Sequence, residues 1–182
     1  AEMLKHGLIS NTAHWAELLN FNTSDIDYTA LKQLVGRSVQ VKEDIVEQDP
    51  FEHGIRKALN LGHTVGHAFE SMALAENRPV LHGYAVAWGI VCELYLSHLK
   101  VGFPKEKMRQ TIQFIKDNYG VFTFDCKKYE QLYAFMTHDK KNTSGTINFT
   151  LLKNIGDIRI NQIADKDTIF EMLDFYRECM GI

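Results

Sequence analysis

Two glycines and two histidines share one short segment of the chain, L-N-L-G-H-T-V-G-H-A-F-E at residues 59–70. The apolar spacing of this segment is typical of a helix, yet inside a helix Gly62 and Gly66 each cost about 1 kcal/mol relative to alanine. A residue without a side chain lets another backbone or a ligand come close. We therefore expect this segment to be a point of close contact in the fold.

The polar residues of the same segment predict a site laid along a helix. If one α-helix begins directly after Asp49-Pro50, then Arg56, Asn60, His63 and His67 fall at i, i+4, i+7 and i+11 and form a single polar stripe. His63 and His67 can both hold a metal, and His82, beyond the next loop, offers a further ligand. The glutamate of an H-E-x-x-H peptidase is absent, which argues against a zinc peptidase.

Helical periodicity dominates the rest of the chain. Further helices are expected at about residues 1–9, 15–19, 27–47, 83–101, 103–119, 127–138 and 165–180. Only residues 147–163 show strand-like runs bounded by turns. The sequence therefore predicts a mainly α, multi-helix fold with one small β-hairpin, in a single domain spanning residues 1–182.

Two further positions indicate charge recognition. On the helix at 27–47 the expected apolar stripe places Lys42 on the buried face, where it either extends its amine to solvent or binds an anion. Glu52 and Arg56 at i, i+4 are expected to form a helix ion pair. Such a pair would also orient the guanidinium toward a substrate carboxylate or phosphate.

Composition restricts the classes of partner. The 182 residues carry a net charge of −3, which gives no reason to expect nucleic acid or an anionic membrane. The three cysteines are widely spaced and odd in number, so neither a disulfide framework nor a zinc ribbon is indicated. No apolar run approaches the roughly 20 residues of a membrane span. We expect a soluble, cytoplasmic protein.

Several blocks resemble one enzyme family. The run L-N-L-G-H-T-V-G-H-A-F-E followed by H-G-Y-A-V-A-W-G is similar to 3-dehydroquinate synthases, as are A-E-M-L-K-H-G at the start and D-K-K-N-T-S-G-T-I-N-F-T-L-L from residue 139. The resemblance covers the C-terminal half of such enzymes, including the fold of that half. It implies that the family's N-terminal NAD-binding domain has no counterpart here, and that the chain, which begins inside a predicted helix, is a fragment cut at a domain boundary.

The resemblance also implies roles for individual residues. It makes Glu2, His63 and His82 the metal ligands. The catalytic groups would be His67, Lys42, Arg56 and Glu52. Substrate would be bound by Lys5, Lys42, Arg56, Asn60, His67 and a lysine of the D-K-K block, with the choice between Lys140 and Lys141 left open. From spacing alone, Glu2 and Lys5 at i, i+3 predict only a surface ion pair.

The implied reaction is a step of the shikimate pathway toward chorismate and the aromatic amino acids. A phosphorylated seven-carbon keto sugar acid, 3-deoxy-D-arabino-heptulosonate 7-phosphate, is converted to 3-dehydroquinate and phosphate. Zinc, or another divalent metal such as cobalt, and NAD would be the cofactors, and the full-length enzyme would be a homodimer. The chain lacks a G-x-G-x-x-G sequence, and NAD contacts are expected in the N-terminal domain. The fragment alone is expected to be inactive.

Two rival interpretations stay open. A related sugar-phosphate cyclase, or a metal-dependent polyol dehydrogenase, would share the histidine spacing, although Arg56, Asn60 and the D-K-K block favour a dehydroquinate synthase. A metal-free helical scaffold or dimerisation module, in which the histidines only pack, belongs to a different class. Metal analysis separates the scaffold from the enzymes.

Overall fold

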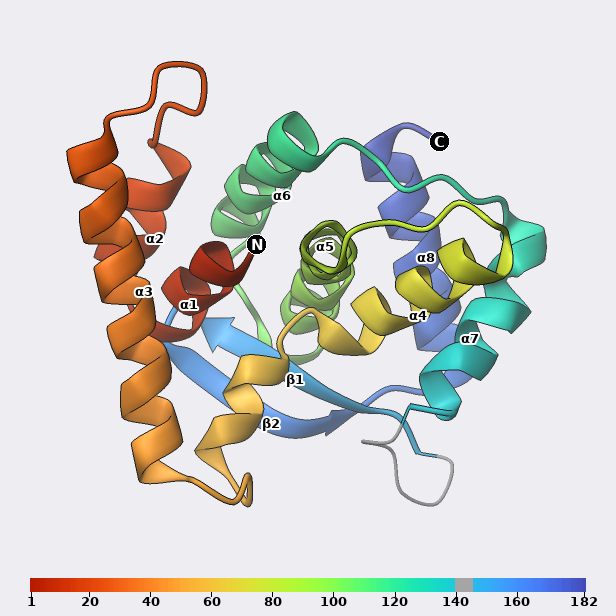
Figure 1. Cartoon of the computed structure of the whole chain (residues 1–182). Coiled ribbons are helices and arrows are strands. Elements are labelled where there is room, and N and C mark those ends of the chain that lie inside the picture. Colours follow the sequence, from red (N-terminus) through yellow and green to blue (C-terminus); the bar gives the residue numbers. More distant parts are fainter. Residues whose placement is uncertain (140–145) are drawn as a thin grey trace.

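The computed structural model describes residues 1–139 and 146–182, and within these ranges it is mainly helical with one β-hairpin (Figure 1). The elements are α1 Glu2–Ser10, α2 Thr12–Leu19, α3 Tyr28–Gln48, η1 Ile55–Asn60, α4 His63–Ala75, α5 His82–Val101, α6 Lys105–Tyr119, η2 Cys126–Lys128, α7 Tyr129–Thr137, β1 Asn148–Asn154, β2 Asp157–Ile163 and α8 Lys166–Met180. The predicted fold class is confirmed. No helix in the described ranges is long and apolar enough to cross a membrane.

Helix α5 is the centre of the molecule. It is buried from Ala85 to Leu94 and packs against α4, α6, α8 and strand β1 (Figure 1). Small residues in its first half let neighbouring elements come near its backbone, while larger apolar side chains further along fill the core. The positions of α4 and β1 are therefore set by their contacts with this helix.

The start of α4 lies directly on the α5 backbone. A Cβ added at Gly89 would lie 2.1 Å from the carbonyl oxygen of Gly62 and 2.6 Å from the amide nitrogen of Gly66. Real Cβ contacts are never so short, so only glycine fits there. The expectation that Gly62 and Gly66 serve a close backbone contact is confirmed, and this packing offsets the helix propensity that they lose.

The hairpin is hydrogen-bonded to both η1 and the start of α4. In β1 the residues Phe149 to Leu152 are all buried, whereas in β2 exposed and partly buried residues mostly alternate. Two threonine hydroxyls make the links: Thr150 donates to the carbonyl of Lys57 in η1, and Thr64 in α4 donates to the carbonyl of Asn148. The hairpin thus holds η1 and the first turn of α4 in a fixed relation.

The prediction of one continuous helix that carries Arg56, Asn60, His63 and His67 is wrong. Ile55–Asn60 forms a 3-10 helix, Leu61 has ψ near 128°, and Gly62 takes the left-handed conformation with φ 82° before α4 begins at His63. A left-handed residue cannot continue a right-handed helix, and glycine adopts it without steric cost. Arg56 and Asn60 therefore do not share a helix face with His63 and His67.

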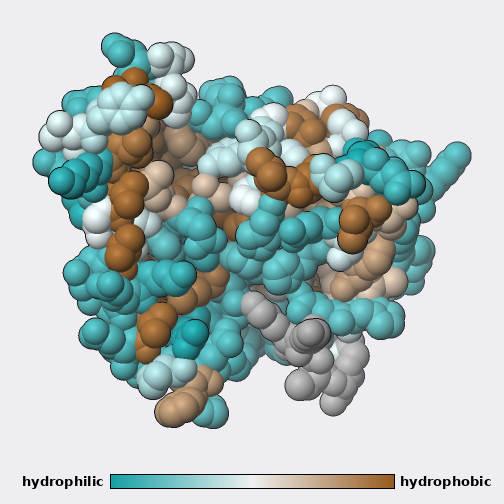
Figure 2. Space-filling view, viewed as in Figure 1, coloured by the Kyte–Doolittle hydropathy of each residue, from teal (hydrophilic) through white to brown (hydrophobic). Residues whose placement is uncertain are grey.

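The face that α3 buries is also displaced from the predicted one. Asp27 caps the helix by accepting hydrogen bonds from two backbone amides, and the buried positions are Leu34, Ser38 and Ile45. Lys42 is exposed, which corrects its predicted burial. The helix packs through one narrow row, so both flanks of that row stay in solvent. Apolar side chains on one flank form a line over α3 in Figure 2.

Candidate metal and anion site

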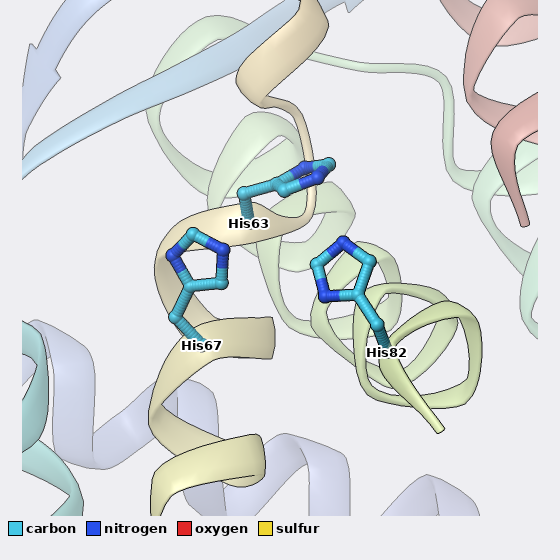
Figure 3. A group of neighbouring side chains, drawn as sticks. All are labelled: His63, His67 and His82. Atoms are coloured by element: carbon cyan, nitrogen blue, oxygen red, sulfur yellow. The ribbon is translucent and has the colours of Figure 1, made fainter. Parts of the chain in front are cut away.

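Three histidines converge between α4 and α5 (Figure 3). His63 and His67 come from the first two turns of α4, and His82 is the first residue of α5. Their ring centroids are 5.4 Å (63 to 67), 5.3 Å (63 to 82) and 5.8 Å (67 to 82) apart. One potential ligand atom from each lies within 4.8 Å of the others. Spacing in the sequence brought two of them together, and the packing of α4 on α5 adds the third.

Each of the three rings is held by its Nδ1 atom. His63 Nδ1 is 3.1 Å from the carbonyl oxygen of Leu61, His67 Nδ1 is 3.1 Å from Asp139 Oδ2, and His82 Nδ1 is 3.1 Å from Glu70 Oε2. A carbonyl or carboxylate oxygen can only accept, so Nδ1 donates in the neutral ring. Nε2 then keeps its lone pair, and metal-ligating histidines commonly have this arrangement.

The donor set suits a divalent transition metal. Neutral imidazole nitrogens are ligands for zinc and cobalt, and three protein ligands leave coordination positions open for substrate oxygens. The cluster is accessible, since the side chains of His67 and His82 are 37% and 49% exposed. The residues present therefore fit a catalytic metal better than a closed structural one.

Glu2 lies at the start of α1 in an ion pair. Its carboxylate is 2.9 Å from Lys5 Nζ, as the spacing predicted, and 3.6 Å from His6 Nε2. Partial burial raises the pKa of Glu2, but the hydrogen bond and the positive charge of Lys5, with smaller contributions from His6 and His63, lower it by more, so the net shift is downward. Glu2 is therefore an ionised carboxylate at the start of α1, and His63 is among the groups that lower its pKa. Its role as a metal ligand stays a prediction.

The residues expected to bind anions are arranged differently. Arg56 Nη1 donates to the carbonyl oxygen of Pro50 at 2.6 Å, and Asn60 Nδ2 donates to Glu52 Oε1 at 3.1 Å. Within the described part of the chain, no ion pair joins Glu52 to Arg56. Glu52 precedes η1 in a left-handed conformation with φ 59°, so the two residues are not one helical turn apart. The predicted helix ion pair is therefore wrong.

Asp49 shapes the loop that leads into η1. Its carboxylate accepts hydrogen bonds from the backbone amides of His53, Gly54 and Arg56 at 2.9, 2.7 and 3.0 Å. These bonds, first that of Gly54, lower the pKa of Asp49 below its usual value. A carboxylate that accepts from three amides between residues 53 and 56 explains why the chain does not continue as an α-helix after Pro50.

The other predicted binding residues are all lysines. Lys5 is buried beside Glu2, and Lys42 is exposed on α3. Lys140 and Lys141 lie outside the described residues, so the choice between them stays open.

Sequence reasoning missed the acidic partners of the histidines. Asp139 immediately precedes the two lysines of the D-K-K block, and Glu70 ends the G-H-A-F-E run, so both lie inside segments already singled out. Glu70 is three residues after His67 on α4, but it contacts His82 on α5 instead. Nothing in local spacing would assign it to that ring.

Comparison with known proteins identifies the family. The model described as "3-dehydroquinate synthase C-terminal" matches residues 1–142. The chain belongs to the 3-dehydroquinate synthase family. It is 59% identical over 182 residues to the 3-dehydroquinate synthase of Parabacteroides distasonis, covering all of this chain and 52% of that protein. It is 37% identical to that of Oceanobacillus iheyensis, covering 99% and 49%. The chain thus spans about half the length of these curated relatives.

Solved structures of related cyclases share the fold. A 2-deoxy-scyllo-inosose synthase complexed with carbaglucose-6-phosphate, NAD⁺ and Co²⁺ matches with a TM-score of 0.75 and 20% identity, over 97% of this chain and 49% of that one. A 2-epi-5-epi-valiolone synthase from Streptomyces hygroscopicus, with NAD⁺ and Zn²⁺ bound, matches with a TM-score of 0.77 and 19% identity over the same shares. At this identity the likeness establishes the architecture of this member of the dehydroquinate synthase family, and not its substrate.

Proposed function

We propose that this chain is the C-terminal, metal- and substrate-binding half of a 3-dehydroquinate synthase. The complete protein would convert 3-deoxy-D-arabino-heptulosonate 7-phosphate to 3-dehydroquinate and phosphate, as a phosphate-eliminating carbon–oxygen lyase. The observation that carries the proposal is the trio of His63, His67 and His82, each with its Nδ1 bonded to an acceptor, in a chain 59% identical to a named 3-dehydroquinate synthase.

The proposed metal ligands are His63 and His82, with Glu2 as the third. When bound, a divalent metal polarises the substrate hydroxyl that is oxidised and lowers the cost of its negative charge. Zinc and cobalt are the candidates, and both occur in the related cyclases. His67 is the competing third ligand, because its ring lies in the same cluster. Ligand-by-ligand substitution distinguishes the two sets.

If Glu2 completes the metal site, His67 is free to act on the substrate. Asp139 holds its Nδ1–H, and the Asp139 side chain is only 11% exposed, so the ring is fixed in one tautomer. Its Nε2 then accepts a hydrogen bond or a proton from a substrate hydroxyl. This assigns proton handling to His67 and orientation of the ring to Asp139.

The basic residues are proposed to bind the two anionic groups of the substrate. Arg56 uses one guanidinium N–H on Pro50, and a guanidinium has five such donors, so the fork can still meet a phosphate or a carboxylate. Asn60, Lys42, Lys5 and a lysine at 140 or 141 would add donors and charge. Glu52 fixes the Asn60 amide and would act through it.

The rest of the enzyme is proposed to lie in a second half that the longer relatives possess. That half would hold NAD, which carries the hydride chemistry, and the complete protein would be a homodimer. The fragment alone would therefore not turn over. A related sugar-phosphate cyclase is the second candidate, since the solved cyclases share this fold. The substrate's carboxylate distinguishes the two candidate enzymes, because of the two substrates only that of the dehydroquinate synthase has a carboxylate.

The test has two arms. Calorimetry of the chain with zinc should show one site per chain, and a chain that binds none would favour the scaffold interpretation. For activity, the chain joined to an N-terminal half from the Parabacteroides distasonis relative is assayed with NAD and metal. We expect phosphate release from the sugar-acid phosphate and none from an uncarboxylated sugar phosphate. The reverse preference would identify the second candidate, and sustained release by residues 1–182 alone would refute the half-enzyme proposal.

A further inference from the structure

A fully buried carboxylate lies behind the histidine cluster. Glu93 on α5 is 0% exposed. Its Oε1 accepts a hydrogen bond from the Gly62 amide at 3.0 Å, and its Oε2 accepts one from the Val65 amide at 3.2 Å. Both carboxylate oxygens are thus engaged with the first turn of α4. Burying a charged group in a core is costly unless its bonds are good ones, so this contact needs a reason.

The reason is the missing cap of α4. The first amides of a helix have no partner within the helix, and a Ser, Thr, Asp or Asn side chain usually accepts from them. Here the cap position is Gly62, which has no side chain and must remain glycine because of its φ of 82° and its contact with α5. A carboxylate from another helix takes over the capping role, and its negative charge suits the positive end of the α4 dipole.

The geometry of α5 makes this possible. Gly89 and Glu93 are one helical turn apart and lie on the same face, where Gly89 lets the α4 backbone approach and Glu93 then reaches its amides. His82 is at i−11 from Glu93 and lies on that face as well. One face of α5 therefore carries His82, Gly89 and Glu93. His82 belongs to the histidine cluster, Gly89 contacts the α4 backbone, and Glu93 binds the first amides of α4, the helix that supplies the other two histidines.

We propose that Glu93 is a positioning residue of the metal site. It fixes the backbone of residues 62–65. The positions of His63 and, one turn later, His67 relative to His82 are thereby held constant. The metal aspect of this inference rests on the proposed function. The anchoring of α4 rests only on the contacts of Glu93, so the two can be measured separately.

The first measurement is amide exchange by NMR in the Glu93→Gln variant. Glutamine keeps the shape of the side chain but presents an NH₂ group to one of the two amides, so at least one hydrogen bond is lost. We expect exchange of the Gly62 and Val65 amides to accelerate by about tenfold or more relative to other α4 amides. Unchanged exchange at both positions would overturn the anchoring role.

The second measurement is metal binding in the same variant. Loss of a residue that orients ligands typically lowers metal affinity by about 10–100-fold, and we expect that range for zinc together with an altered Co²⁺ absorption spectrum. Glu93→Asp, which keeps the charge but shortens the reach, should give a smaller loss and serves if Glu93→Gln does not fold. Wild-type affinity in a folded variant would overturn the proposal.

The matched control is Ser97→Ala. Ser97 is also on α5 and fully buried, and its hydroxyl donates to the Glu93 backbone carbonyl and accepts from the Leu152 amide, so neither of these bonds is made to α4. It should lower the melting temperature but leave zinc affinity and the two amides unchanged. An equal loss of zinc affinity in Ser97→Ala would mean that the Glu93 variants lose affinity through lower overall stability, and it would overturn the proposal. If the wild-type chain binds no zinc, the proposed metal site fails, and exchange alone decides whether Glu93 anchors α4.

Discussion

The histidine side and the basic side of the candidate site are built in different ways. His63, His67 and His82 are on helices whose backbones touch, and each ring has a fixed acceptor. By contrast, Lys42 is exposed on α3, and Arg56 lies at the start of the short 3-10 helix η1, where its side chain donates to the carbonyl oxygen of Pro50. The core of this chain therefore preorganises the imidazoles, whereas Lys42 and Arg56 are outside the core and depend on solvent or on one local hydrogen bond.

The sharpest test of this contrast substitutes one glycine on each side. Gly89→Ala should cost about 3 kcal/mol or more, since its Cβ would meet the Gly62 carbonyl in a packed core. Gly36→Ala in α3, where an added Cβ meets nothing within 4 Å, should instead stabilise the chain by about 0.5–1 kcal/mol. Urea unfolding measures both free energies. Effects of the same sign would remove the distinction between the two sides.

Removing one histidine should abolish most of the metal affinity. A structural zinc site is worth about 10–16 kcal/mol over four ligands, so His82→Ala should lose about 3 kcal/mol, or about a hundredfold in zinc affinity. His53→Ala, an exposed histidine outside the cluster, is the control and should bind zinc normally. Calorimetry on residues 1–182 measures both. An unchanged affinity in His82→Ala would contradict the ligand set.

The same titration identifies the third ligand. We expect Glu2→Gln to weaken zinc binding by about tenfold or more, and His67→Gln to leave it nearly unchanged. The opposite result would select the three imidazoles that the structure gathers. It would also mean that His67 has no separate task in proton transfer.

On the basic side, the effect should appear in catalysis instead of metal binding. In a complete enzyme, Arg56→Ala should remove a charge-assisted contact worth about 1.5–3 kcal/mol of transition-state stabilisation. It should therefore lower kcat/KM by about 10–100-fold. Zinc affinity should stay the same. Arg37→Ala, which only breaks a surface pair with Glu17, is the control. A loss of kcat/KM much below tenfold would mean that Arg56 only stabilises the structure through its hydrogen bond to Pro50 and does not bind substrate.

The smallest expected effect concerns the carboxylate behind His82. Glu70→Gln keeps an acceptor but removes the charge, and it should weaken zinc binding by about tenfold. Glu47→Gln, on an exposed position of α3, should not change it. If both variants bind zinc like the wild type, the His82 ring is oriented by packing alone.

Local pattern was sufficient for much of the fold. The 3.6-residue periodicity predicted seven of the helices within a few residues, and turn residues placed the hairpin, because both signals depend on neighbours in the sequence. It failed between residues 49 and 62. There, helical spacing of polar residues suggested a continuous helix, but the Asp49 carboxylate closes a loop and Gly62 takes a left-handed turn.

The sequence by itself determined the helical architecture, the hairpin, and the histidine spacing that makes a metal site plausible. Only the tertiary structure decided which atoms face that site. Two of the contacts that fix the rings and their helix join residues far apart in the chain, with 72 positions between His67 and Asp139 and 31 between Gly62 and Glu93. Such pairs leave no periodic signal in a single sequence, because they arise only when α4 packs against α5 and α7.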